Sequence, residues 1–207
     1  MIDLEFLLPI LAILIVSLSF HEAAHAWTAD KLGDPTAREL GRITLNPLAH
    51  IDWIGTVLFP LIAFTTGAPL LGWAKPVPVN FHRLRAPRRD FAIIAAAGPI
   101  SNLVLAVVAA LLFEAAFSGS STGMLAGILI QTVLMNVLLA VFNMIPVPPL
   151  DGGNVLAGIL PEQFARLIDG LRPYGFLILY ALLLTGVLAR IVVPVKDWIF
   201  NLLLPVM

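Results

Sequence analysis

The stretch LEFLLPILAILIVSLSFHEAAHAW, residues 4–27, decides the fold. It is apolar and long enough to cross a bilayer as a helix, for which about 20 residues suffice. Near its end stands H-E-x-x-H, residues 21–25. Residues four apart share a helix face, so His21 and His25 can present two imidazoles to one metal ion. Glu22 is then placed to act as a general base toward water. Ionisable residues are costly in a membrane helix, which indicates a functional site.

The composition predicts an all-α polytopic membrane protein. Of 207 residues, 59% are hydrophobic and 12% are charged, whereas soluble domains carry about 25% charged residues. We expect a single domain over residues 1–207, with a catalytic core of about 4–155 and further membrane segments in 156–207. The net charge of -1 argues against nucleic acid as a partner. Because the chain has no cysteine, a metal must be held by His, Asp or Glu.

Apolar stretches with few charges predict about five to six membrane segments. They cover residues 4–27, 53–74, 91–117, 124–146 and 174–189, and 198–207 is too short to cross alone. The loop 75–90 carries five basic residues against one acid, so we place it in the cytoplasm. The N-terminus carries acids and no bases and fits the outside, so residues 28–52, which follow the first span, should also lie in the cytoplasm. The segment between the two loops contains Pro60, Gly67 and Pro69, and we expect it to be a re-entrant hairpin.

A second polar cluster is NMIPVPPLDGG, residues 143–153. Three prolines within four residues cannot continue a helix without losing backbone hydrogen bonds. Asp151 is the only charge between Glu114 and Glu162. One interpretation is an interfacial turn with a solvated carboxylate. The other is a third zinc ligand, because two His and a carboxylate with an open position suit catalytic zinc. The loop assignments place this cluster and His21 in the same cytoplasmic half.

Taken together, these motifs resemble the site-2 protease family of intramembrane zinc metalloproteases. H-E-x-x-H on an early membrane helix is followed by N-x-x-P-x-P-x-L-D-G at residues 143–152, and G-P-x-x-N at 98–102 is similar to the family's third-helix motif. The stretches 41–52 and 72–80 are similar to those of short bacterial and archaeal members without accessory domains. The resemblance covers about residues 15–155. It implies that His21, His25 and Asp151 bind one Zn²⁺ per chain and that Glu22 is the general base.

Other polar residues have two interpretations each. By the resemblance, Asn143 and Asn102 help to position substrate or support the site. Asn143 could instead cap the end of its helix, and Asn102 could be a helix–helix hydrogen-bonding residue. His50 is either a turn residue or part of the site lining. His82 is expected at the interface, and Glu114 is expected to be a helix-boundary charge.

The stretch 75–80, KPVPVN, is hostile to helix but compatible with an edge strand. Residues 42–45 also read as a short strand. We therefore expect a small β element at the cytoplasmic mouth, where the backbone around Val77 and Val79 pairs with an extended substrate. A substrate helix hides its peptide bonds, so an unwound segment needs such replacement partners. The alternative is a plain loop with prolines.

The function predicted from the sequence is an intramembrane zinc metalloprotease. It is expected in the cell membrane, crossing it several times, with its active site toward the cytoplasm. The resemblance implies a substrate that is a membrane-spanning regulatory protein, such as an anti-sigma factor. Alternatives are a protease acting on soluble or lipidated tails, a metal transporter, and an inactive zinc-binding membrane protein. A transporter has no need of Glu22 beside the first ligand. The oligomeric state is not predicted.

Overall fold

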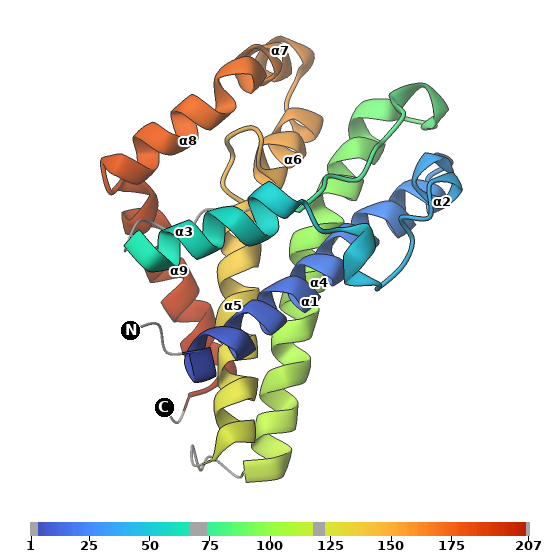
Figure 1. The fold of residues 1–207 in the computed structure, drawn as a ribbon. Helices are drawn as coiled ribbons and strands as arrows, with labels where there is room; N and C mark the ends of the chain where they lie inside the picture. Colours follow the sequence, from blue (N-terminus) through green and yellow to red (C-terminus); the bar gives the residue numbers. More distant parts are fainter. Residues whose placement is uncertain (1–3, 67–73, 118–122, 206–207) are drawn as a thin grey trace.

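Helices make up the fold. The computed structural model describes residues 4–66, 74–117 and 123–205, in which helices are joined by short turns (Figure 1). The helices and helical turns are α1 (Leu4–Lys31), α2 (Thr36–Glu39), η1 (Pro47–Ala49), η2 (Trp53–Leu58), α3 (Phe59–Thr66), η3 (Phe81–Arg83), α4 (Pro87–Phe117), α5 (Met124–Asn143), α6 (Asp151–Ile159), α7 (Glu162–Leu171), η4 (Arg172–Tyr174), α8 (Gly175–Leu184) and α9 (Val187–Leu203).

Helix α4 is the centre of the packing, with α1, α5 and α6 against it. Small side chains form much of its buried surface, among them Ala106, Ala109 and Ala110, which pack in one cluster with Val133 and Val137 of α5. Small residues let helix backbones approach closely, which is the usual basis of helix association within a bilayer. The site described below lies where these helices meet.

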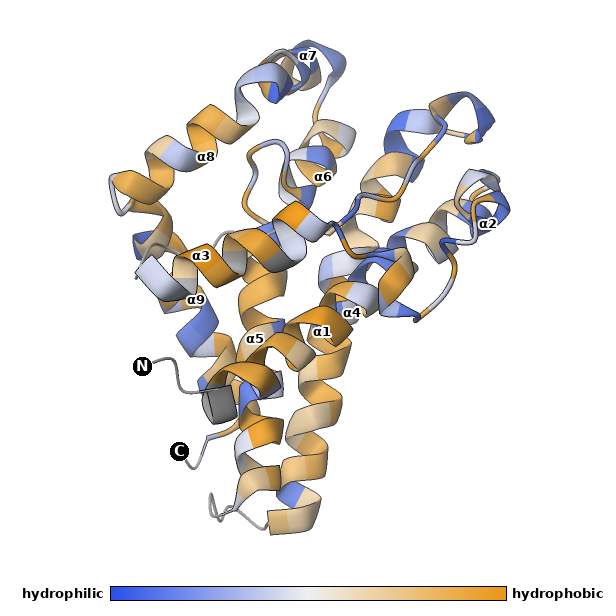
Figure 2. Cartoon of the chain, in the orientation of Figure 1, coloured by the Kyte–Doolittle hydropathy of each residue, from blue (hydrophilic) through white to orange (hydrophobic). Residues whose placement is uncertain are grey.

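Within the part of the chain that the structure describes, four helices are long and apolar enough to cross a membrane, by length and composition. They are Leu7–Lys31, Pro87–Phe117, Met124–Asn143 and Glu162–Leu184. Figure 2 shows apolar residues along most of α1, α4, α5 and α8, and polar residues toward α2, α7 and the start of α4. The predicted all-α, multi-pass membrane protein is therefore confirmed, but the count of five to six segments is not. The predicted segment 174–189 divides where Gly186 adopts a left-handed φ of 71° before α9 begins.

The residues that flank the predicted hairpin 53–74 lie close to each other. Its first part is η2 followed by α3, which lies across α5 in Figure 1, while residues 67–73 lie outside the described part of the chain. Lys75 N donates to His50 O at 2.9 Å, so the chain entering the segment meets the chain leaving it. Asn80 N likewise donates to Asp34 Oδ2 at 2.6 Å. These bonds bring residues 34 and 50 close to residues 80 and 75, while the course of the segment in a membrane stays a prediction.

The predicted small β element is corrected by the structure, because none of the described residues forms a strand. The two stretches that were expected to pair do meet, but through a side chain. Buried Arg42 donates from Nη2 to Lys75 O at 2.5 Å and from Nη1 to Pro76 O at 3.3 Å. The guanidinium thus replaces the backbone hydrogen bonds that two paired strands would form. Pro76 and Pro78 have no N–H and could not donate such bonds. Residues 76–80 remain free of helix.

Candidate metal centre

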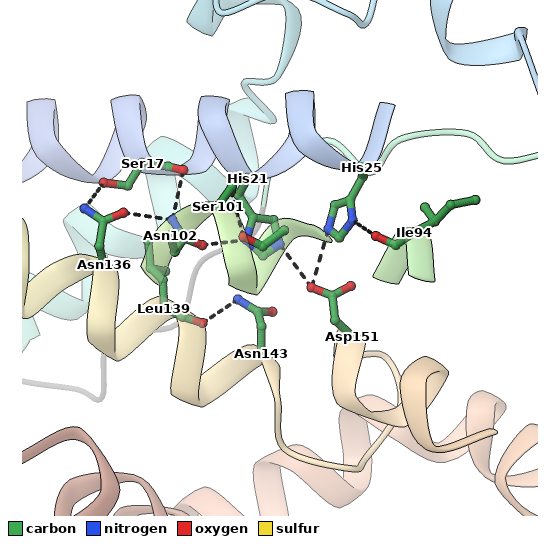
Figure 3. A network of polar contacts seen from close by, with 11 residues as sticks. Ser17, His21, His25, Ile94, Ser101, Asn102, Asn136, Leu139, Asn143 and Asp151 are labelled. Carbon is green, nitrogen blue, oxygen red and sulfur yellow. Dashed lines mark hydrogen bonds and ion pairs between the residues drawn. The ribbon is translucent and has the colours of Figure 1, made fainter. Parts of the chain in front are cut away.

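His21, His25 and Asp151 come together between α1 and α6. Asp151 Oδ2 lies 3.0 Å from His21 Nε2 and 3.4 Å from His25 Nε2 (Figure 3). The two imidazole rings are 4.6 Å apart between centroids and nearly perpendicular. The helical spacing of i and i+4 places both histidines on the face of α1 that is turned toward α4 and α6. Three residues separated by up to 130 positions therefore converge on one point.

Asp151 reaches this point because the chain between α5 and α6 folds tightly. Helix α5 ends at Asn143, residues 144–150 form turns, and Asp151 is the first residue of α6. A Cβ added to Gly152 would lie 2.3 Å from Met144 O, so only glycine allows this approach. A carboxylate in the first turn of a helix is also favoured by the helix dipole.

The three donors fit a tetrahedral zinc ion. Zn–N and Zn–O bonds of about 2.1 Å at tetrahedral angles separate neighbouring ligand atoms by about 3.4 Å, close to the two observed distances. Gly98 of α4 adds a second observation. A Cβ there would lie 2.4 Å from His25 Nε2 and 2.5 Å from His21 Nε2. The space in front of the two ligand nitrogens therefore exists only because residue 98 has no side chain.

Each histidine is oriented by a hydrogen bond at its other nitrogen. His25 Nδ1 lies 2.7 Å from Ile94 O, and His21 Nδ1 lies 2.6 Å from Asn102 Oδ1. A backbone carbonyl can only accept, so Nδ1 of His25 carries a proton, and Nε2, which faces Asp151, is the nitrogen left to bind a metal ion. Such outer hydrogen bonds are the usual means of fixing the tautomer of a metal-ligating histidine.

Glu22 is buried beside this cluster, and it lines the same cavity as His21, His25 and Asp151. Its negative charge also acts on Arg42. Burial lowers the pKa of Arg42, and the negative charge of Glu22 opposes that shift. The carboxylate therefore lies next to the candidate metal site without forming part of the three-residue cluster.

The cavity has a volume of about 560 Å³ and is mostly apolar. Its walls come from α1, η2, α4, α5, α6, α8 and the segment 74–79. Of the residues predicted for the site, Asn143, Val77 and Val79 lie in its lining. Asn143 also donates from Nδ2 to Leu139 O at 3.0 Å. Among the described residues, neither Val77 nor Val79 has a backbone hydrogen bond from its N–H.

Two predicted residues lie outside the lining. Asn102 is fully buried and touches the site only through His21. His50 is 2% exposed, and its Nε2 pairs with Thr44 O at 2.8 Å while its carbonyl accepts from Lys75 N. His50 thus supports the start of the segment 74–79 rather than the cavity.

Asp34 fastens the far end of that segment. Its carboxylate accepts from Thr36 N at 3.1 Å, from Thr36 Oγ1 at 2.5 Å and from Asn80 N at 2.6 Å. Burial acts to raise the pKa of Asp34, but these donors together outweigh it and hold the pKa below its usual value. The segment lining the cavity is therefore held at both ends, by Arg42 and by Asp34.

Functional residues that were not predicted from the sequence are Ser17, Asn136, Arg42 and, for its missing side chain, Gly98. Ser17 and Asn136 are buried and belong to a polar network behind His21. A signal was present, because both are polar residues within uncharged helices, where each polar group needs a partner.

Comparisons with known proteins agree with this site. The model of peptidase family M50 matches residues 9–126 and 119–185. The chain is 36% identical over 202 residues to "Putative zinc metalloprotease YwhC" of Bacillus subtilis, covering 92% of this chain and 87% of that protein. It is 32% identical over 188 residues to "Putative zinc metalloprotease Rip2" of Mycolicibacterium smegmatis, covering 90% and 71%. No solved structure matches. A match over most of the chain, in ranges that include His21, His25 and Asp151, places this membrane protein in peptidase family M50, the site-2 protease family.

Proposed function

We propose that this chain is an intramembrane zinc endopeptidase in which His21, His25 and Asp151 hold one Zn²⁺ and Glu22 is the general base. It hydrolyses a peptide bond in or near the transmembrane segment of a membrane-anchored regulatory protein. The observation that carries the proposal is the meeting of three ligand atoms at 3.0 and 3.4 Å beside a buried glutamate, in an apolar cavity.

The division of labour follows from the donor set. Zinc, when bound, polarises the scissile carbonyl and acidifies a water molecule. Glu22 takes the proton of the attacking water and passes it to the leaving amine as the C–N bond breaks. Asn143 lies across the same cavity, where its amide can position the substrate. Asn102 supports the site from behind His21.

The cavity supports an apolar, extended substrate. Its lining includes apolar side chains such as Leu14 of α1 and Leu138 and Phe142 of α5, which suit the side chains of a membrane segment. The free N–H groups of Val77 and Val79 supply backbone donors for a segment that has lost its helical hydrogen bonds. The substrate class is that of an anti-sigma factor, a single-span regulator with its soluble part on one side.

The cell membrane is the proposed location, with the cavity opening toward the cytoplasm. The support is the basic segment 75–90, whose Arg83 pairs with Glu39 at 3.1 Å. Two basic residues of the same segment, Arg85 and Arg89, are exposed and suit the anionic cytoplasmic leaflet.

The test compares wild type with Glu22→Gln in purified protein. A membrane-spanning substrate reconstituted with the protein in vesicles should be cut by the wild type only. Both proteins should carry about one Zn²⁺ per chain, because Glu22 is not a ligand in this motif. Equal cleavage by the two proteins would refute the mechanism. Zinc flux into vesicles that depends on His21 but not on Glu22 would favour a transporter instead.

A further inference from the structure

Two buried amides, on α4 and α5, connect His21 to Ser17, one turn earlier on its own helix α1. Asn102 of α4 and Asn136 of α5 have no exposed surface, and Ser17 of α1 is 2% exposed. His21 Nδ1 lies 2.6 Å from Asn102 Oδ1. Asn102 Nδ2 lies 2.9 Å from Asn136 Oδ1, and Asn136 Nδ2 lies 2.9 Å from Ser17 Oγ (Figure 3). The chain of hydrogen bonds runs through three helices.

Two backbone carbonyls fix the direction of this chain. Asn136 Nδ2 donates to Thr132 O at 2.9 Å, and Asn102 Nδ2 donates to Ser17 O at 3.2 Å. A carbonyl oxygen only accepts, so the nitrogen of each amide must face it. Both N–H bonds of each amide group then have a partner. The side-chain oxygen of Asn102 is left facing His21, where it can only accept.

This direction decides which nitrogen of His21 carries the proton. An accepting Asn102 Oδ1 requires a proton on Nδ1, so Nε2, which faces Asp151, is the nitrogen left to bind a metal ion. If the Asn102 amide turned over, its nitrogen would donate to Nδ1, and the proton of neutral His21 would move to Nε2. Nε2 could not then bind a metal. The turned amide would also bring its oxygen against Asn136 Oδ1 and Ser17 O, both of which are acceptors.

We propose that Asn136, together with Ser17, is a positioning residue for the metal site. It holds the Asn102 amide in the orientation in which its oxygen accepts from His21 Nδ1, which leaves His21 Nε2 to bind zinc. The inference rests on the proposed zinc site and adds to it a residue that does not touch metal or substrate. His25 needs no such relay, because its Nδ1 donates directly to Ile94 O. The two ligands therefore differ in how they are oriented, and only His21 depends on Asn136.

The test is the zinc affinity of the purified full-length protein, measured by competition with a chelator. Asn136→Leu should weaken zinc binding about tenfold, at the lower end of the 10–100-fold typical of outer-shell partners. Ser17→Ala removes one acceptor and should give a smaller loss in the same direction, which provides a milder variant if leucine prevents folding. Ser101→Ala, a neighbouring hydroxyl that donates to Gly98 O within α4, should leave the affinity unchanged.

A double-mutant cycle separates the relay from a general loss of packing. In an Asn102→Ala background the relay is already cut, so Asn136→Leu should cause no further loss of zinc affinity. An equal loss in that background, or wild-type affinity in Asn136→Leu and Ser17→Ala, would overturn the relay while leaving the zinc site intact. Wild-type zinc affinity in His21→Ala would instead overturn the zinc site, and the relay with it.

Discussion

Gly98→Ala should destroy the metal site without removing any ligand. The added methyl carbon would lie 2.4 Å from His25 Nε2 and 2.5 Å from His21 Nε2, whereas ordinary contacts begin at 3.4 Å. Relief requires a displacement of about 1 Å, while metal–ligand distances tolerate only about 0.2 Å. We therefore expect at least a 100-fold loss of zinc affinity. The overpacking itself should cost about 1–3 kcal/mol of folding stability.

The assay is zinc content after dialysis, followed by chelator competition on the same protein. Gly127→Ala is the matched control, because it is the same substitution in a helix, α5, where a Cβ meets nothing within 4 Å. Gly127→Ala should retain wild-type zinc binding. If Gly98→Ala binds zinc within threefold of wild type while remaining folded, the reasoning that places the metal between His21, His25 and Asp151 is refuted.

Three further predictions concern the surroundings of the site. Cysteines at Thr36 and Arg85 should both be labelled only from the cytoplasmic side in intact cells, and labelling from opposite sides would disprove the re-entrant hairpin. Val79→Pro removes an N–H in the cavity lining and should impair cleavage far more than Val79→Ala, with zinc content unchanged in both; equal effects would count against backbone pairing with the substrate. Because the pKa of Asp34 is lowered in the fold, its stabilising effect is present above about pH 4 and is lost as pH falls through the folded-state pKa. Thermal unfolding of wild type between pH 7 and pH 3 should show that loss, and Asp34→Asn should show a lower stability at pH 7 with a smaller change on acidification.

The metal cluster could be predicted because its information is local. Helix periodicity places His21 and His25 on one face, and the proline run before Asp151 ends α5 because proline cannot continue a helix. The positive-inside rule then placed both clusters at one depth. The meeting of Asp151 Oδ2 with both histidines agrees with that expectation.

Long-range features were harder to predict. The expected β element failed because local propensity does not show that Arg42 reaches across to Lys75 O and Pro76 O. The count of membrane segments is not confirmed, because the described part of segment 53–74 forms only the short helices η2 and α3, and residues 198–203 belong to the 17-residue helix α9. An isolated glycine in an apolar run also does not predict the left-handed Gly186 that separates α8 from α9. Asn136 could be recognised as a buried polar residue, but its partner Asn102 lies on another helix, and sequence periodicity does not specify the pairing of α4 with α5.

The most direct test of the zinc site is X-ray absorption of zinc in the purified protein, with Asp151→Ala measured beside wild type. Wild type should contain about one zinc per chain, with two imidazole nitrogens at about 2.0–2.1 Å and oxygen ligands at about 2.0–2.2 Å. Asp151→Ala should lose most of its zinc and its cleavage activity. An unchanged zinc content and an unchanged spectrum in Asp151→Ala would contradict the assignment of His21, His25 and Asp151 as the ligand set.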